Sequence, residues 1–211
     1  MPETTNGKIG NLLEQAARQS DSATSEGSSV VKATRIFPDA ANAEDAFAVL
    51  RKKLFSIEHW NDCSEISSFK LFDETGIAEP TKLARVGDYI RITLPGSGKD
   101  DWVKVIEINE SPGETVFTVQ PSHDPTDAEN KRATSHFFTD ASTNNFCLQR
   151  KDRTINFYVI GLNEKTNTSE TSGIIETVRN YATANLGYFL GIQKTQWKSF
   201  CENFLETGKN K

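Results

Sequence analysis

The chain has 211 residues, of which 36% are hydrophobic, and its formal net charge at pH 7 is −5. This length suits one domain with a buried core and an additional arm. The negative charge argues against a nucleic-acid partner, because nonspecific binding to phosphates depends on clustered Lys and Arg. No apolar run approaches the about 20 residues that a membrane-spanning helix needs, and the N-terminus lacks a signal-peptide pattern. We therefore expect no membrane span and a cytoplasmic location.

The cysteines Cys63, Cys147 and Cys201 are an odd number and lie far apart in the chain. This pattern favours reduced, partly buried thiols over disulfides. His59 and Cys63 have a spacing that two metal ligands could use, but no second closely spaced pair accompanies them. The sequence therefore predicts no metal site and no cofactor.

Residues 1–29 differ in composition from the rest, and we interpret them as an arm before a single domain at 30–211. A short amphipathic helix is predicted at 9–19, followed by a Ser-rich linker. Its apolar stripe consists of Ile9, Leu12, Leu13, Ala16 and Ala17. Because an isolated helix this short is marginal in water, the stripe needs a surface. Either the arm docks on the chain's own core or stays disordered, or Ile9, Leu12, Leu13 and Ala16 bind a protein partner.

The middle of the chain reads as short alternating strands interrupted by one amphipathic helix. The helix follows a first strand at 30–37, with Asn42 as its N-cap and an end near Trp60. Further strands are predicted at 69–71, 89–94, 102–108, 115–120, 135–139, 146–149 and 154–162. The short turns between them indicate antiparallel pairing. The apolar phase shifts near Val105–Ile106, which predicts a β-bulge.

A helical tail at 172–205 closes the domain as a lid in two parts. Gly187 and Gly191 weaken the first part, and Thr195 is the predicted cap of the second. The apolar stripe of the second part, which should pack on the sheet, is Trp197, Phe200, Cys201, Phe204 and Leu205. The predicted class is therefore α+β. It has a curved antiparallel sheet of about seven or eight strands, one helix after the first strand and a two-part C-terminal lid.

No constellation of catalytic residues accompanies these elements. Gly96-Ser97-Gly98-Lys99 lacks the first glycine and the final Ser or Thr of a phosphate-binding loop. Ser122-His123-Asp124 cannot form a nucleophilic triad, because adjacent side chains point apart. A ligand cavity under the terminal helix would be lined by polar-tipped aromatic groups on the strands. The candidates are Trp102, His136 and Tyr158.

The element order resembles the helix-grip fold of the START/Bet v 1-like (SRPBCC) superfamily over residues 30–205. The local matches are the helix that ends at His59-Trp60 and the terminal segment TQWKSFCENFLE. In that superfamily a curved sheet wraps a long C-terminal helix, and the space between them often holds a hydrophobic ligand. The segments VGDYIRITLPGSGKDDWVKV, QPSHDPTD and SHFF are also similar to uncharacterised proteins of Bacteroidota, which suggests a bacterial origin. A small SH3-like barrel that begins at Val86-Gly87-Asp88 is the competing fold.

The resemblance implies noncatalytic binding of a small apolar ligand between the sheet and the C-terminal helix. The alternative is a structural or adaptor component of a multiprotein bacterial assembly that docks through its N-terminal arm. A cyclase or hydrolase of the same superfamily is a third class, for which the sequence offers no nucleophile and no acid–base pair.

Overall fold

A computed structural model describes residues 7–20, 27–93, 100–127, 138–165 and 186–206. Within these residues, seven strands form one antiparallel sheet in the order β1-β7-β6-β5-β4-β3-β2. The strands are β1 (Gly27–Ile36), β2 (Ser68–Phe72), β3 (Tyr89–Thr93), β4 (Asp100–Ser111), β5 (Glu114–Pro121), β6 (Thr143–Lys151) and β7 (Thr154–Glu164). The described helices are α1 (Lys8–Ser20), α2 (Ala40–Phe55), the 3-10 helix η1 (Ile57–Trp60) and α4 (Leu186–Phe204).

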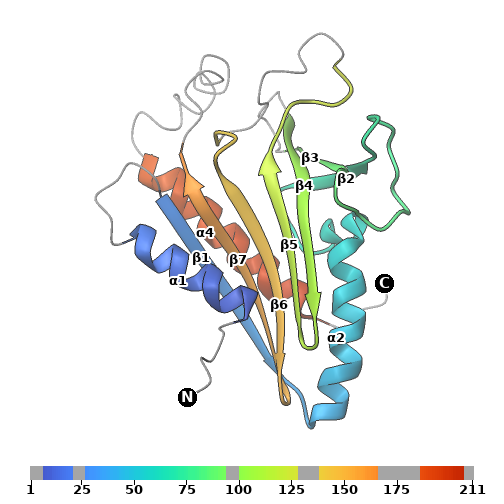
Figure 1. The fold of residues 1–211 in the computed structure, drawn as a ribbon, viewed down its shortest axis with the longest axis vertical. Coiled ribbons are helices and arrows are strands. Elements are labelled where there is room, and N and C mark those ends of the chain that lie inside the picture. The colour runs from blue at the N-terminus through green and yellow to red at the C-terminus, as the bar shows by residue number, and fades with distance from the viewer. Residues whose placement is uncertain (1–6, 21–26, 94–99, 128–137, 166–185, 207–211) are drawn as a thin grey trace.

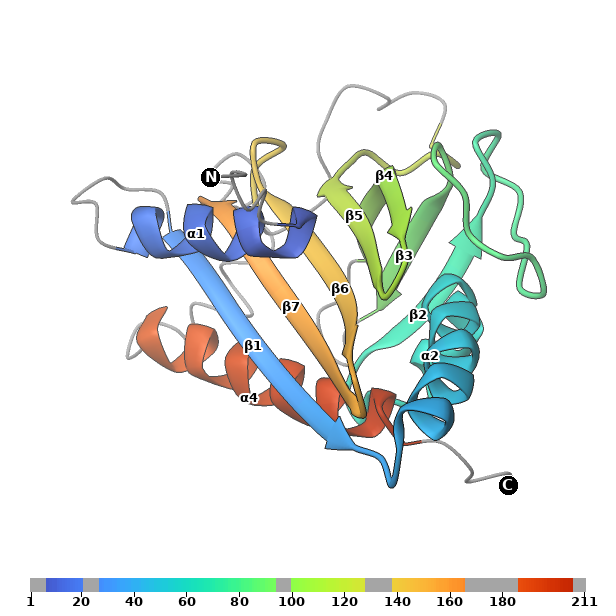
Figure 2. The same cartoon turned by 60° about the horizontal axis from the view of Figure 1, so that its bottom comes forward.

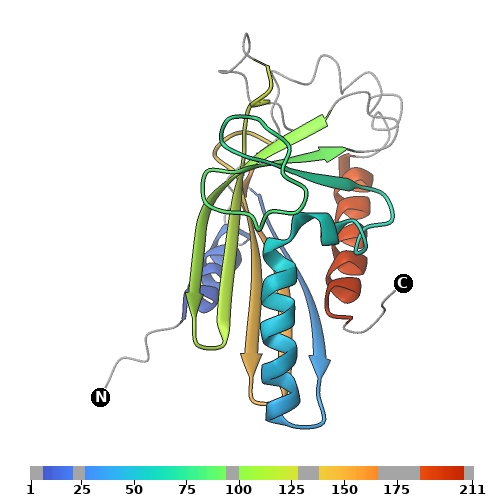
Figure 3. The same ribbon diagram turned by 90° about the vertical axis from the view of Figure 1, so that its right-hand side faces the viewer.

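The sheet is curved, with α2 and α4 on one face and α1 on the other (Figures 1 and 3). We call these the inner face and the outer face. The α+β class, the antiparallel pairing and the C-terminal helix on the sheet are confirmed. The barrel alternative is wrong, because β1 and β2 end the strand order as separate edges. The predicted strand at 135–139 lies mostly outside the described residues.

The helix after the first strand begins earlier than the sequence predicted. Asp39 is the N-cap, and its Oδ1 accepts a hydrogen bond of 2.8 Å from the Asn42 amide. Asn42 therefore lies within α2, and its amide is one of the groups that a cap must satisfy. The helix ends at Phe55, after which η1 carries the chain to Trp60.

Two details of the hairpins follow from their residues. The register of β4 against β5 shifts between Val105 and Glu107, which confirms the predicted bulge. Gly113 turns the β4–β5 hairpin with a φ of 80°, a conformation that glycine adopts without strain.

The terminal helix is one continuous element in its described part. It runs through Gly187, Gly191 and Thr195 to Phe204, so the predicted start of a second helix with Thr195 as its cap is wrong. A glycine in a helix interior costs only about 1 kcal/mol, which tertiary packing readily offsets. The predicted first part of the lid lies mostly outside the described residues.

Both faces of the sheet are covered, although they carry different side chains. The inner face contributes to a large apolar core with α2 and α4. On the outer face, a smaller cluster lies beneath α1 and consists of Val116, Cys147, Tyr158, Ile160 and Leu162. Ile9, Leu12 and Ala16 of α1 are buried in this cluster, whereas Ala17 is exposed. Because α1 covers the outer face of β7 as well, this strand is buried along nearly its whole length.

Thr115 offers a test of this core. Its side chain is fully buried beside Leu148, and among the described residues its hydroxyl has no hydrogen-bond partner. Replacing it with valine keeps the shape and removes the desolvated hydroxyl, so Thr115→Val should raise the free energy of unfolding by about 1 kcal/mol. Thr115→Ser keeps the hydroxyl and loses a methyl group, so it should lower stability. Urea unfolding followed by circular dichroism distinguishes these results, and a less stable valine variant would contradict the assignment.

Candidate functional site

The inner face is filled at one end by an aromatic cluster around Trp60. The Trp60 ring lies 4.6 Å from Phe146 and 5.7 Å from Phe200, measured between centroids. Phe69 and Phe117 meet the same indole edge-on at 5.6 and 5.8 Å. Trp60 comes from η1, Phe200 from α4 and the other three rings from the sheet. This cluster therefore joins all three elements and occupies the space between them.

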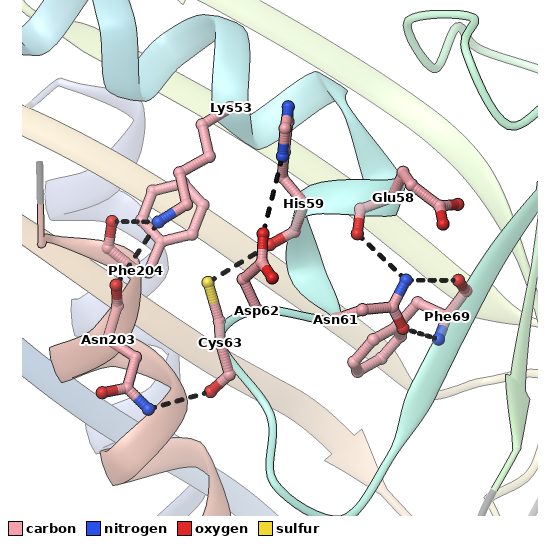
Figure 4. Close-up of polar contacts among 9 residues, drawn as sticks. All are labelled: Lys53, Glu58, His59, Asn61, Asp62, Cys63, Phe69, Asn203 and Phe204. Carbon is pink, nitrogen blue, oxygen red and sulfur yellow. Dashed lines mark hydrogen bonds and ion pairs between the residues drawn. The ribbon is translucent and has the colours of Figure 1, made fainter. Parts of the chain in front are cut away.

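The C-terminal end of α4 is anchored to this cluster and to α2. Phe204 stacks on Phe157 of β7, with ring centroids 4.1 Å apart and an interplanar angle of 13°. Lys53 Nζ donates hydrogen bonds to the carbonyl oxygens of Asn203 and Phe204, at 3.3 and 3.0 Å (Figure 4). Arg35 Nη1 donates to the Leu205 carbonyl at 2.7 Å. These cations satisfy carbonyl groups at the helix end that lack partners within the helix.

The loop after η1 fastens α4 and β2 through backbone groups. Asn61 accepts a hydrogen bond from the Phe69 amide and donates one to the Phe69 carbonyl, at 2.7 and 3.0 Å (Figure 4). Asn203 Nδ2 donates to the Cys63 carbonyl at 3.2 Å. Through these bonds, the loop fixes the start of β2 and the last turn of α4 together.

His59 and Cys63 have structural roles in this loop. The Cys63 thiol is buried and donates to the His59 carbonyl at 3.5 Å, while His59 Nδ1 lies 3.7 Å from the Asp62 carboxylate (Figure 4). Burial raises the pKa of Cys63, which favours the neutral thiol. In the described part of the chain, no three His, Cys, Asp or Glu side chains are grouped as metal ligands.

Beyond the aromatic cluster, the side chains of the inner face change from apolar to polar between two neighbouring rows across the strands. We call the first of two neighbouring rows the apolar row, which is Val31, Val159, Phe146 and Phe117 on β1, β7, β6 and β5. The next row, which we call the polar row, is Ser29, Gly161 and Asn144 on β1, β7 and β6, and it ends at the buried Val119 of β5. All four members of the apolar row are buried, whereas Ser29 and Asn144 are only half-buried. On β1, β7 and β6, side-chain volume therefore drops between these rows.

A carboxyl group lies over the glycine of the polar row. Asn163 has a φ of 53°, and Glu164 after it turns its side chain back onto the inner face. The Ser29 hydroxyl donates to Glu164 Oε1 at 2.9 Å. A Cβ atom at position 161 would overlap the Glu164 carboxyl and the Ser29 hydroxyl as they lie here, so the glycine gives this carboxyl its room. Burial raises the pKa of Glu164.

The turn that directs Glu164 is held from the outer side by α1. The Asn163 amide donates to Gln19 Oε1 at 3.0 Å, and Gln19 Nε2 donates to Asn163 Oδ1 at 2.5 Å. Ser142 Oγ donates to the Asn163 carbonyl at 2.7 Å. Asn163 is therefore fixed in its left-handed conformation by two separate segments of the chain.

The structure does not bring the predicted pocket residues together under α4. Trp102 lies on the outer face against Phe72, with centroids 4.9 Å apart, and Tyr158 lies on that face beneath α1. Their strand neighbours Val103 and Phe157 point inward instead. Neither candidate therefore lines the space between the sheet and α4, and His136 lies outside the described residues.

The apolar stripe of α1 docks on the chain's own sheet. Ile9, Leu12 and Ala16 are buried, and Leu13 is partly buried against the same cluster. At the N-terminal end of α1, Lys8 forms a 3.0 Å ion pair with Glu107 of β4. Partner binding through these four apolar residues stays a prediction, and it would require α1 to leave the sheet.

Sequence reasoning missed the residues of the polar row and Glu164. A signal was present at Gly161, because an isolated glycine within an apolar strand marks a close approach of other atoms. Ser29 gave no such signal, since it closes the Ser-rich stretch that resembles a linker.

No protein-family model matches the chain, and no curated protein matches its sequence. A hypothetical protein from Helicobacter pylori has a similar structure, with a TM-score of 0.52 and 8% identity over 84% of this chain and 86% of that one. This likeness shows the fold alone. Solved structures of major latex-like protein 151 from Panax ginseng and of norcoclaurine synthase from Thalictrum flavum each align with a TM-score of 0.38 and 12% identity. They cover 75% and 89% of this chain, and 98% and 99% of their own.

Among the described residues, no helix combines the length and the hydrophobicity that a membrane-spanning segment requires.

Proposed function

We propose that this protein is a noncatalytic binding protein that holds a small apolar ligand between the inner face of the sheet and α4. The observation that carries the proposal is the step from the apolar row to the polar row. Two residues away from the Val31–Val159 pair, the next pair on the same face is Ser29 and Gly161, so the side chains on the sheet are smaller there. Half-burial of Ser29 and Asn144 agrees with room above this row.

The neighbouring side chains suit an apolar ligand. Trp197 lies 5.5 Å from Phe146, between ring centroids, and so ends the aromatic cluster on the side of the polar row. Towards Leu186, α4 continues for further turns along β1 and β7 (Figure 2). A ligand here would have aromatic rings at one end and a few polar groups at the other, which is the usual composition of small-molecule sites.

Binding of the uncharged fluorophore N-phenyl-1-naphthylamine tests the proposal. The wild-type protein should bind one molecule per chain, and Asn144→Phe should weaken binding by at least about tenfold because the new ring fills the space above the polar row. Thr143→Phe is the matched control, since it places the same ring on the neighbouring residue of β6, which faces the outer side. Circular dichroism shows whether both variants fold. Failure of the wild type to bind saturably, or equal binding by Asn144→Phe, would refute the proposal.

A further inference from the structure

We propose that Glu164 is the polar anchor of this ligand space and selects an amphiphile whose head group is a positively charged hydrogen-bond donor, such as an alkylammonium. This inference rests on the proposed function and adds the chemistry of the ligand's polar end.

The first support is the position of the carboxyl. A residue at the end of a surface strand can extend its side chain into water at no cost, yet Glu164 returns over Gly161 to the inner face. Two features of the chain allow this placement, namely the left-handed conformation of Asn163 and the missing side chain at position 161. Both are local departures from regular strand structure, and both serve to bring a carboxyl to the ligand space.

The second support is charge. Within the described part of the chain, no Lys or Arg forms an ion pair with Glu164. Its carboxyl accepts a hydrogen bond from the Ser29 hydroxyl. Burial raises the pKa of Glu164 because the ionised form loses hydration without gaining a counter-charge. A cationic head group would supply that charge and a donor for the second carboxylate oxygen.

The third support is rigidity. Gln19 of α1 bonds both the amide and the side chain of Asn163, and Ser142 bonds its carbonyl. The carboxyl is therefore held in place before a ligand arrives, which lowers the entropy cost of binding. Gln19 acts as a positioning residue, since it reaches the carboxyl only through Asn163.

The test uses displacement of N-phenyl-1-naphthylamine by decylamine, decanol and decanoate, with the two ions below their critical micelle concentrations and decanol below its solubility limit. At neutral pH the wild type should be half-displaced by decylammonium at a concentration at least about tenfold lower than by decanoate, with decanol between them. Glu164→Gln keeps the size of the side chain and its acceptor for Ser29, and it should abolish this preference while leaving the fluorophore affinity within about twofold. Glu44→Gln makes the same charge change at an exposed site on α2 and should retain the preference.

The outcomes separate this inference from the proposed function. If the fluorophore binds but the wild type ranks the three amphiphiles equally, or if Glu164→Gln keeps the preference, the anchor is refuted and the ligand space stands. If the fluorophore does not bind the wild type, both are refuted. An equal ranking by the wild type refutes the anchor without any variant, and a preference is assigned to Glu164 by its loss in Glu164→Gln.

Discussion

Replacing Trp60 with alanine is expected to lower the free energy of unfolding by about 3–5 kcal/mol, the range for large aromatic side chains removed from a core. Trp60 is 2% exposed, and its ring meets four phenylalanines from the sheet and from α4. Its indole nitrogen donates to the Leu54 carbonyl at 3.1 Å, so alanine also leaves a buried acceptor unpaired. The cavity would open where η1, the sheet and α4 meet, and surrounding rings can refill it only in part.

Urea unfolding followed by circular dichroism measures this loss. Trp60→Phe retains most of the apolar area and should cost clearly less than alanine, although it forfeits the hydrogen bond. Val49→Ala is the control on α2, because Val49 is 60% exposed and its truncation should change stability by less than about 0.5 kcal/mol. If Trp60→Ala cost less than about 1 kcal/mol, the aromatic cluster would not be the centre of the core.

Replacing Ala16 with aspartate is expected to release α1 from the outer face and to make Cys147 reactive. Ala16 is 1% exposed in the cluster that also contains Cys147, and a carboxylate there would be buried without a partner. In the wild type Cys147 is fully buried, and burial raises its pKa, so the reactive thiolate is scarce. Alkylation of Cys147 by iodoacetamide, followed by mass spectrometry, should accelerate by at least about tenfold once α1 is released.

Ala17→Asp is the matched control, since it places the same substitution on the next residue, which is exposed. It should leave the labelling rate of Cys147 unchanged. Cys63 and Cys201 lie in the inner core, so they should label slowly in both variants. Slow labelling of Cys147 in Ala16→Asp would show that α1 is not its shield, and fast labelling of all three thiols would indicate global unfolding. Release of α1 alone would also expose Ile9, Leu12 and Leu13, as docking to a partner requires.

Much of the secondary structure could be predicted from local patterns. The alternation of Ile90 and Ile92 with polar residues placed β3, and the change of phase at Val105 located the bulge. The predicted ends of the helices were less accurate than the predicted strands. Asp39 and Asn42 are both good caps by residue type, and the structure begins α2 directly after Asp39, whose side chain accepts a hydrogen bond from the Asn42 amide. The continuity of α4 through Gly191 depends on its packing against the sheet, which local propensity does not include.

The faces of the strands were harder to assign than the strands themselves. A strand with one covered face shows a clear alternation, but β7 is buried on both faces, so Phe157 and Tyr158 are equally apolar neighbours. The sequence could not say which of them points to α4. Trp102 has the same ambiguity, because the outer face beneath it is covered by Phe72 and Tyr89.

By itself, the sequence determined the class of the fold, the order of its elements and the amphipathic faces of α1 and α4, because these depend on periodicities within short segments. Only the tertiary structure decided which sheet face each helix covers and where the inner face turns from aromatic to polar. Ser29, Asn144 and Gly161 become neighbours through strand register, across more than a hundred residues of chain. Glu164 lies on the inner face because the chain turns at Asn163, which α1 holds by hydrogen bonds, and no local pattern encodes that contact.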